Sequence, residues 1–435
     1  MILAIVSMML LGLVDTFFIS LLGTKELAAA SFVMPVYMFL VNVALGMGMG
    51  VSSLTSRLIG EQKHTACARF VTDSQILSLL VIVCTATVLS LLLDPLFEGL
   101  GATEEVMPHI RGYMSILLPG IPLVVLTFIT NSTFRAIGHI KASAILSTLM
   151  SLLNLLLDPL FIFGAGPIEG MGMPGAALAT VVAASISWLA CFYILAFHEK
   201  LVDFRVPKLS ALMENWKNLM EIAIPAIGAN IMTPVAAGIV TAMIARYGAE
   251  AVAGFGVGAR IEAMSLLITY ALSSTLPMFI GQNIGAGRND RAYAALMMCL
   301  RFVLVFQVAV YLCLLLFIPL ITSTFSSNPL VIRVIENYLW FVPVSYSAHA
   351  VVILVMVSLN VMKRPRIALQ LTFLRLMLLY VPLAYAGSVL WDTRGLFIGA
   401  ALGNFIAGYI AYRKVARVCE EIGLGPGQTR LEPAA

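Results

Sequence analysis

The protein has 435 residues, of which 60% are apolar and only 11% are charged, and its formal net charge is +4. A soluble globular protein carries about 25% charged residues, so this chain has too few to cover a water-exposed surface and must be embedded in a membrane. The composition excludes a soluble enzyme, a disulfide-stapled secreted domain and a disordered chain, and the small net charge does not favour nucleic-acid binding.

Twelve apolar stretches along the chain are long enough to cross a bilayer as helices, since a spanning helix needs ~20 mostly apolar residues. No stretch is typical of a strand or of a soluble domain. The sequence therefore predicts an all-α integral membrane protein. The expected spans are residues 1–22, 27–56, 71–93, 110–136, 141–163, 174–197, 217–246, 252–282, 293–322, 330–361, 366–390 and 395–416.

The distribution of Lys and Arg predicts the orientation of these spans, because cytoplasmic connections are enriched in both residues. The connections after the even-numbered spans, counted with the adjoining ends of the spans and the C-terminal tail, hold 19 of the 26 Lys and Arg residues. The connections after the odd-numbered spans, counted in the same way, hold only Lys25, Arg111, Arg246, Arg333 and Arg394. We therefore expect a protein of the cytoplasmic (inner) membrane with both termini in the cytoplasm.

Four segments of the first half recur in the second half, three at an offset of 225 residues and one at 224. Six spans followed by six of the same orientation form a parallel repeat, which is typical of transporters that bind substrate between two halves. The matched pairs are LLGTKELAAASF (21–32) with RYGAEAVAGFGV (246–257), IGEQKHTACAR (59–69) with IGAGRNDRAYA (284–294), RAIGHIKAS (135–143) with NVMKRPRIA (360–368) and GAALAT (175–180) with GAALGN (399–404).

The repeat and the lengths of the connections predict two lobes. We expect an N-terminal lobe of spans 1–6 over residues 1–197 and a C-terminal lobe of spans 7–12 over residues 217–418. Residues 198–216 form the longest connection and are expected to be an amphipathic cytoplasmic linker, and residues 419–435 a mobile cytoplasmic tail. Because the start of span 7 has no counterpart in the first half, we expect about ten or more residues before Met1 in the natural chain.

The chain lacks the motifs of several functional classes. The six Cys residues form no Cys-x-x-Cys pair and no His lies at metal-ligand spacing from another, so we expect no disulfide framework, no metal site and no cofactor. The chain has no Gly-x-x-x-x-Gly-Lys-Ser/Thr, which argues against an ATP-driven pump in one chain. The Gly-rich stretch 164–175 follows a membrane helix rather than a strand, and so does not fit a dinucleotide-binding motif.

Seven segments spread over the whole chain carry a family resemblance. They are LVDTFFISLLGTKELAA (13–29), RAIGHIKAS (135–143), LNLLLDPLFIFG (153–164), GAALAT (175–180), VGARIEAMSL (257–266), LPMFIGQNIGAGRNDRA (276–292) and RPRIAL (364–369). With these segments the chain resembles the multidrug and toxic compound extrusion (MATE) family. The resemblance implies twelve transmembrane helices in two six-helix lobes, related by pseudo-two-fold symmetry around a central cleft. It also implies export of cationic lipophilic drugs and dyes by alternating access, against an inward flow of protons or sodium ions.

The positions of the acidic residues resemble the DinF-like branch of this family. Sodium-linked members of the NorM-like branch resemble one another in acids on spans 7 and 10, where this chain has only Glu221 and Glu336 near the span ends. Here the deep acids are Asp15 in span 1 and Asp158 in span 5. In the DinF-like branch, carboxylates of the N-terminal lobe carry the coupling ion, so the resemblance assigns that role to Asp15 and Asp158.

Three further residues match the pattern of that branch: Asn154 one turn before Asp158, Tyr113 on span 4 and Thr180 on span 6. Asn154 and Asp158 are four residues apart and therefore share one helix face. A charged Asp at membrane depth is unfavourable by about 3 kcal/mol, and two neighbouring carboxyls favour sharing a proton. The alternative is structural: Asp15 caps a kink, and Asp158 is an interfacial residue beside a proline.

The C-terminal lobe has a candidate charge cluster of Arg260, Glu262 and Arg375. Arg260 and Glu262 are two residues apart and point to different faces, so we expect a contact between Glu262 and Arg375. A structural ion pair without a transport role is the alternative. Of the 23 Met residues, we expect most to pack between helices and some to form adaptable walls of a binding cleft. Gly46, Gly48 and Gly50 form a small-residue stripe suited to close helix contact.

These residues together predict a monomeric proton/drug antiporter that is not an enzyme and exports cationic lipophilic compounds. Sodium in place of protons stays open, since two carboxylates with Asn and Thr oxygens also suit a hard cation. A lipid-linked precursor flippase of the same superfamily would need a strongly cationic cavity, whereas only Arg260 and Arg375 are deep. A prenyl-transferring membrane enzyme would need clustered acids such as Asp-Asp-x-x-Asp, which the chain lacks.

Overall fold

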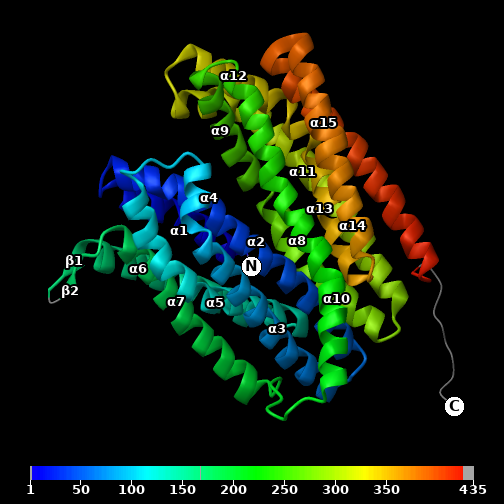
Figure 1. Ribbon diagram of the computed structural model, residues 1–435. Coiled ribbons are helices and arrows are strands. Elements are labelled where there is room, and N and C mark those ends of the chain that lie inside the picture. Colours follow the sequence, from blue (N-terminus) through cyan, green and yellow to red (C-terminus); the bar gives the residue numbers. More distant parts are fainter. Residues whose placement is uncertain (1, 167, 425–435) are drawn as a thin grey trace. The chain divides into compact units, whose positions relative to one another are not determined.

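The structure is a computed structural model that describes residues 2–166 and 168–424. It is almost entirely helical and divides into two compact units, one ending at Ile227 and the other beginning at Gly228. Within the described residues, each unit contains six membrane-length helical segments (Figure 1). The predicted all-α membrane architecture is confirmed.

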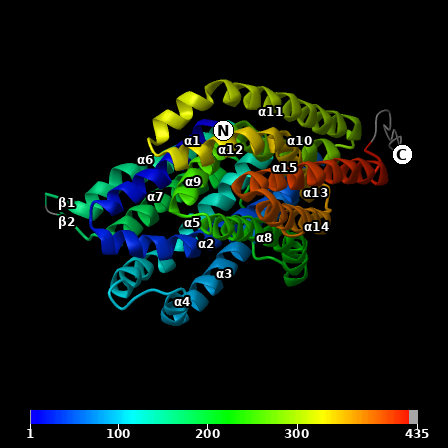
Figure 2. The ribbon, with the colours of Figure 1, turned by 90° about the horizontal axis from the view of Figure 1, so that it is seen from above.

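The first unit comprises α1 to α7 and the beginning of α8. Its α4 has seven residues and is too short to cross a bilayer. In Figure 2, α3 and α4 lie at one edge of this unit, away from α6 and α7. The elements are α1 (Ile2–Ser20), α2 (Thr24–Gly60), α3 (His64–Leu91), α4 (Leu93–Gly99), α5 (Met107–Ile137), α6 (Ile140–Phe163), β1 (Gly164–Ala165), β2 (Ile168–Glu169), α7 (Met173–Tyr193) with its π-helical end η1 (Ile194–His198), and α8 (Leu209–Ala245).

The second unit contains several broken helices. The pair α9 and α10 is bent by 44°, and α15 is kinked at Trp391 and Asp392, of which Asp392 has a φ of 53°. The helix α15 continues to Glu421, and the expected tail from residue 425 on lies outside the described residues. The elements are α9 (Ala249–Ser265), α10 (Leu267–Gly285), α11 (Asn289–Phe325), α12 (Pro329–Phe341), η2 (Pro343–Ser345), α13 (Tyr346–Val361), α14 (Pro365–Phe373), η3 (Leu374–Tyr380) and α15 (Val381–Glu421).

The twelve predicted spans correspond to helical segments of the described chain. Nine helices are long and apolar enough to cross a membrane by themselves, and the bent pair α9 and α10 makes a tenth. The 19-residue α1 and the division of the α14–α15 stretch at its kink complete the set. The predicted break between spans 11 and 12, at residues 391–394, coincides with that kink.

The expectation that no stretch forms a strand is wrong at one short hairpin. Gly164–Ala165 pairs antiparallel with Ile168–Glu169. Gly164 and Gly166 have φ values of 81° and 60°, which glycine adopts readily and which reverse the chain within a few residues. Two-residue strands are too short for the alternation of apolar and polar residues by which a strand is recognised in a sequence.

The starts of the helices preserve the internal repeat. The residues before α2 and α9, Gly23 and Gly248, both have positive φ. Three pairs of helices begin 225 residues apart, namely α2 at Thr24 and α9 at Ala249, α3 at His64 and α11 at Asn289, and α6 at Ile140 and α14 at Pro365. The duplicated sequence segments therefore mark duplicated helix boundaries.

The connection between the units differs from the expected linker 198–216. Its residues 209–216 are the first turns of α8, and the units separate inside this helix, after Ile227. The beginning of α8 is fixed on α3, because Asn215 Nδ2 donates to Asp73 Oδ2 at 2.8 Å and Trp216 Nε1 donates to Asp73 O at 3.0 Å. The amphipathic pattern that suggested a linker is thus the solvent-facing start of a long helix.

The glycine stripe of α2 makes the close contacts expected of it. A Cβ placed on Gly46 would lie 2.7 Å from Ile227 N of α8, and one on Gly48 would lie 2.6 Å from Ser132 Oγ of α5. Real Cβ atoms do not approach other atoms so closely, so larger residues here would push the neighbouring helices away.

The helix α1 is held to the first unit at its C-terminal end. Of the α1 side chains that the structure describes, only Ile19 is buried. Ile19 packs with Ile162 and Ala176, and the Phe18 ring meets the Phe163 ring edge-on at 6.3 Å. This end of α1 lies beside α6 (Figure 1) and carries Asp15.

Candidate functional site

Asn154 joins the two acidic residues of the first unit. It lies on α6, one turn before Asp158, and both side chains are almost fully buried (2% and 1% exposed). With its oxygen toward the Thr180 backbone N–H at 3.2 Å, the Asn154 amide donates to Asp15 Oδ1 at 3.0 Å and to Asp158 Oδ2 at 3.3 Å. The reverse orientation would turn the amide oxygen toward two carboxyl groups, so this orientation is assigned from the hydrogen-bonding pattern.

Asp15 and Asp158 lie close enough for a side-chain hydrogen bond between their carboxyl groups. Two ionised carboxylates can only accept hydrogen bonds, so this contact needs a proton on one of them. In a low-dielectric interior two adjacent negative charges repel strongly. The pair is therefore suited to hold one shared proton and to exchange it when the surroundings change.

The local sequence explains how these groups converge. Asn154 and Asp158 are four residues apart on α6 and so share one face. Pro159 has no N–H, which leaves the Leu155 carbonyl without its usual helical donor and makes the backbone beside Asp158 polar. Asp15 arrives from α1, whose C-terminal end is anchored on α6.

A cavity of about 150 Å³ opens beside Asp15, between α1, α2, α5, α6 and α7. It has room for roughly five water molecules at ~30 Å³ each, enough for a proton path or for part of an organic substrate. Four of the lining residues are Met34, Met38, Met150 and Met173. Flexible, polarisable Met side chains adapt to ligands of different shape.

The structure brings all five candidate residues of the first unit together. Tyr113 of α5 lines the cavity, and the Thr180 hydroxyl of α7 lies 3.3 Å from the Asn154 amide. Tyr37 of α2 lines the same cavity and was missed in the sequence. The sequence feature that could have indicated it is a Tyr within an apolar span, two residues after Pro35, since the hydroxyl of a Tyr inside a helix bundle usually has a polar partner.

The donor set of this site suits a small monovalent cation. It offers two carboxyls and the nearby Thr180 hydroxyl, which are ligands for a proton or a hard cation such as Na⁺, while Asn154 turns its amide N–H groups toward the carboxyls. Among residues 2–166 and 168–424, no group of three or more His, Cys, Asp or Glu side chains is arranged to hold a metal ion.

A second polar cluster lies in the second unit, around Glu262 of α9. The Tyr338 hydroxyl of α12 donates to Glu262 Oε2 at 2.6 Å, and His349 Nδ1 of α13 lies 3.2 Å from Glu262 Oε1. Gly258, one turn before Glu262, makes room for the Tyr338 ring, because a Cβ there would lie 2.6 Å from it. The Glu262 carboxylate of α9 thus contacts side chains of α12 and α13, and the cluster joins three helices.

The expected contact between Glu262 and Arg375 is replaced by the pairing of Glu262 with His349. Arg375 Nε donates to Asn404 Oδ1 at 3.1 Å, and its charge acts on Glu262 through space. Arg260 is exposed and lies outside the cluster, because residues two apart on a helix face different directions. His349 was missed because a lone His in an apolar span has no spacing signal.

The MatE family model matches residues 1–160 and 225–386, one stretch in each half of the chain and together more than half of it. The chain belongs to the MATE family. Members of this family are transporters, so the predictions of a multi-pass membrane transporter and of a protein that is not an enzyme are confirmed.

Similar proteins extend this MATE match over nearly the whole chain. A FAD transporter of Shewanella oneidensis is 37% identical over 415 residues, which are 94% of this chain and 91% of that protein. The multidrug export protein MepA of Staphylococcus aureus is 27% identical over 286 residues, 64% of this chain and 61% of its own length. The crystal structure of the Vibrio cholerae MATE transporter VcmN in the bent form matches with a TM-score of 0.92 and 28% identity, covering 97% of this chain and 95% of VcmN.

Proposed function

We propose that the protein is a proton-coupled exporter in which Asp15 and Asp158 carry the coupling proton, as in the DinF-like branch of the family. The observation that carries the proposal is the Asn154 bridge, which holds two carboxyls from different helices at 3.0 Å and 3.3 Å beside a cavity. A structural cap would need one carboxyl and one helix end. Two carboxyls in contact, with room beside them, suit a group that gains and loses a proton.

The coupling follows from charge. With Asp15 ionised, the cavity attracts a cationic substrate, and a proton that neutralises the pair weakens this attraction and releases the substrate to the exterior. When the pair is next open to the cytoplasm, it loses the proton and binds substrate again. Coupling requires only that proton and substrate favour different states of the same site. The membrane potential contributes roughly 2.3 kcal/mol per charge for each 100 mV.

Organic cations are the first substrate class that we propose. The two acids, the two Tyr rings and the four Met residues of the cavity support it, since aromatic faces and carboxylates both attract cations. Export of drugs by MepA, the 27% identical relative, supports it as well.

FAD is the second candidate, because the relative that is 37% identical over 94% of this chain is named a FAD transporter. FAD carries negative phosphates, so it would be repelled by an ionised Asp15–Asp158 pair and tolerated by a protonated one. Binding of an organic cation should therefore strengthen as pH rises, and binding of FAD at this site should strengthen as pH falls. The opposite signs separate the two substrates.

The deciding experiment uses purified protein in proteoliposomes with pH and sodium gradients imposed separately. We expect an ethidium-like dye to move in response to the pH gradient, and Asp15→Asn to reduce that movement by about tenfold or more. Undiminished pH-driven movement in Asp15→Asn would contradict the proposal. A response to sodium alone would assign the same pair of carboxyls to Na⁺.

We further propose that the protein lies in the inner membrane with both termini in the cytoplasm. The concentration of Lys and Arg in the even-numbered connections supports this orientation. Labelling of single Cys residues placed in successive connections of intact and of opened cells tests it, since only the odd-numbered connections should react in intact cells.

A further inference from the structure

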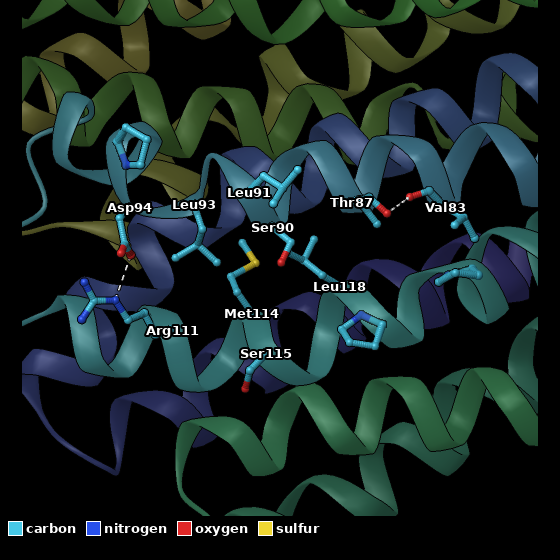
Figure 3. Close-up of a pocket in the computed structure, with 14 residues that line it drawn as sticks. Val83, Thr87, Ser90, Leu91, Leu93, Asp94, Arg111, Met114, Ser115 and Leu118 are labelled. Atoms are coloured by element: carbon cyan, nitrogen blue, oxygen red, sulfur yellow. Dashed lines mark hydrogen bonds and ion pairs between the residues drawn. The ribbon is translucent and has the colours of Figure 1, made fainter.

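A long groove opens on the first unit between α3, α4 and the N-terminal part of α5 (Figure 3). Its volume is about 630 Å³. Most of the wall is apolar, from Val83 to Leu93 on one side and from Met114 to Pro122 on the other. Ser90 and Met114 point into the space between the two helices, and the ion pair of Asp94 and Arg111 lies at one end (Figure 3).

The charged end of the groove lies at a membrane surface. The 23 residues of α5 between Arg111 and Arg135 carry no charge, and the 24 steps from one Arg to the other make ≈ 36 Å of helix, which matches one bilayer crossing. The groove follows α5 from Arg111 to Pro122, or ≈ 16 Å. It therefore runs from the headgroup level to the middle of the bilayer, which is the depth of one lipid leaflet.

The ion pair of Asp94 and Arg111 at the end of the groove leaves part of its hydrogen-bonding capacity without a partner in the described chain. Arg111 Nε donates to Asp94 Oδ1 at 2.8 Å, and the two side chains are about half exposed (53% and 48%). Within the described chain neither residue makes a second ion pair, so Asp94 Oδ2 and the two terminal nitrogens of Arg111 are open to a ligand. Arg111 also holds the pKa of Asp94 below its ordinary value, because it donates a hydrogen bond to the carboxylate.

A contribution to folding stability does not explain why the Asp94–Arg111 pair lies at the end of the groove, since an exposed ion pair contributes only about 0–1 kcal/mol. Together the pair and the groove form one site, in which a cation and an anion stand side by side at the top of an apolar channel of leaflet depth. Zwitterionic phospholipids have the complementary arrangement, with an amine and a phosphate above two acyl chains.

We propose that the groove binds phosphatidylethanolamine. The ammonium group would donate to Asp94, the phosphate would accept from Arg111, and one acyl chain would lie between α3 and α5. The hydroxyl of Ser90, one turn below the ion pair, lies where the glycerol esters would pass.

The surrounding charges favour this lipid over its competitors. Glu98 is exposed on α4, the helix that carries Asp94, and repels an anionic headgroup such as that of phosphatidylglycerol. Phosphatidylcholine has no N–H and so donates no hydrogen bond to Asp94, whereas the ethanolamine ammonium has three. The primary amine of phosphatidylethanolamine is therefore the group by which the site selects this lipid.

Native mass spectrometry of the delipidated full-length protein tests the proposal. The probes are phosphatidylethanolamine, phosphatidylglycerol and phosphatidylcholine with identical acyl chains. We expect the wild type to retain phosphatidylethanolamine about tenfold more tightly than the other two, the effect of one charge-assisted hydrogen bond. In Asp94→Asn this preference should disappear, and Ser90→Phe, which fills the groove, should weaken retention of all three lipids.

Glu104→Gln is the matched control, because it removes an exposed carboxylate of the connection between α4 and α5 that does not line the groove. It should behave like the wild type. Equal retention of phosphatidylethanolamine and phosphatidylglycerol by the wild type would overturn the proposal. So would a preference that survives Asp94→Asn, or one that Glu104→Gln reduces as much as Asp94→Asn does.

Discussion

Asn154 Nδ2 donates to Asp15 Oδ1 at 3.0 Å and thereby ties α1 to α6 by a hydrogen bond at the depth of the cavity. The bond is strongest when Asp15 is ionised, because charged acceptors form shorter and stronger hydrogen bonds. A proton on Asp15 therefore loosens α1 close to the end at which Ile19 and Phe18 pack against the first unit. This couples the occupancy of a proton site to the position of a helix.

Asn154→Ala tests this relationship. The change leaves the buried Asp158 carboxyl without its amide donor, which costs about 1–3 kcal/mol, and frees Asp15 from α6. We expect a lower melting temperature and transport that no longer responds to a pH gradient. The measurements are thermal unfolding in detergent and dye movement in proteoliposomes.

The control for that variant is Asn289→Ala, which removes a partly buried amide of the second unit that donates to the Gly423 carbonyl at 3.3 Å. It should lower the melting temperature at most slightly and leave the pH response intact. A normal pH response in Asn154→Ala would show that the amide only fills space.

Gly175→Ala should damage the site without touching its chemistry. A Cβ at Gly175 would lie 2.2 Å from the Phe161 carbonyl oxygen, so α7 must move away from α6. This shift carries Thr180 away from Asn154, and overpacking of this kind costs about 1–3 kcal/mol. We expect weaker transport and a lower melting temperature, measured in the same two assays.

Gly238→Ala of α8 is the matched control for that change, since no atom lies within 4 Å of a Cβ at this position. Alanine is more favourable than glycine in a helix interior by roughly 0.5–1 kcal/mol, so this variant should be as stable as the wild type or more so. If both substitutions had equal effects, close packing of α6 and α7 would not be the cause.

Asp73→Ala should destabilise the first unit strongly. Asp73 is fully buried, accepts from Arg69 Nε at 2.8 Å and from Asn215 Nδ2 at 2.8 Å, and so fastens the start of α8 on α3. Removing one partner of a buried ion pair costs about 3–5 kcal/mol. The melting temperature should fall by far more than in Glu61→Ala, which breaks the exposed pair with Lys63. Equal falls would mean that the network adds no stability.

The sequence predicts the architecture well because lipid imposes simple rules on it. Apolar length predicts the twelve spans, and Asp15 and Asp158 are recognisable because a charged residue inside an apolar stretch is rare. Asp73 and His349 were missed for a different reason. Asp73 pairs with Arg69 on its own helix, but its bond with Asn215 spans 142 residues, and His349 meets Glu262 of another helix. Only the packed structure brings such distant positions together.

The same limit explains the error at Glu262. The sequence offers Arg375 as the only other deep charge, and Coulomb attraction alone favours their pairing. In the structure the Glu262 carboxylate is contacted instead by the Tyr338 hydroxyl of α12 and the His349 imidazole of α13. The approach of Tyr338 depends on the absence of a side chain at Gly258 of α9, which is a packing feature rather than a charge pattern.

Glu262→Gln separates the two acidic clusters by function. If the proton is carried by Asp15 and Asp158, the variant should still transport dye in response to a pH gradient, because Gln keeps an oxygen that can accept from Tyr338. It should lose stability, since the Tyr338 bond to a charged acceptor contributes about 1.5–3 kcal/mol and a bond to a neutral acceptor about 1 kcal/mol. Tyr338→Phe, which removes the hydroxyl and keeps the ring, should reproduce the loss of stability with the pH response unchanged. Loss of the pH response in both variants, at a melting temperature that still allows folding, would move the coupling proton to the second unit and contradict the assignment to Asp15.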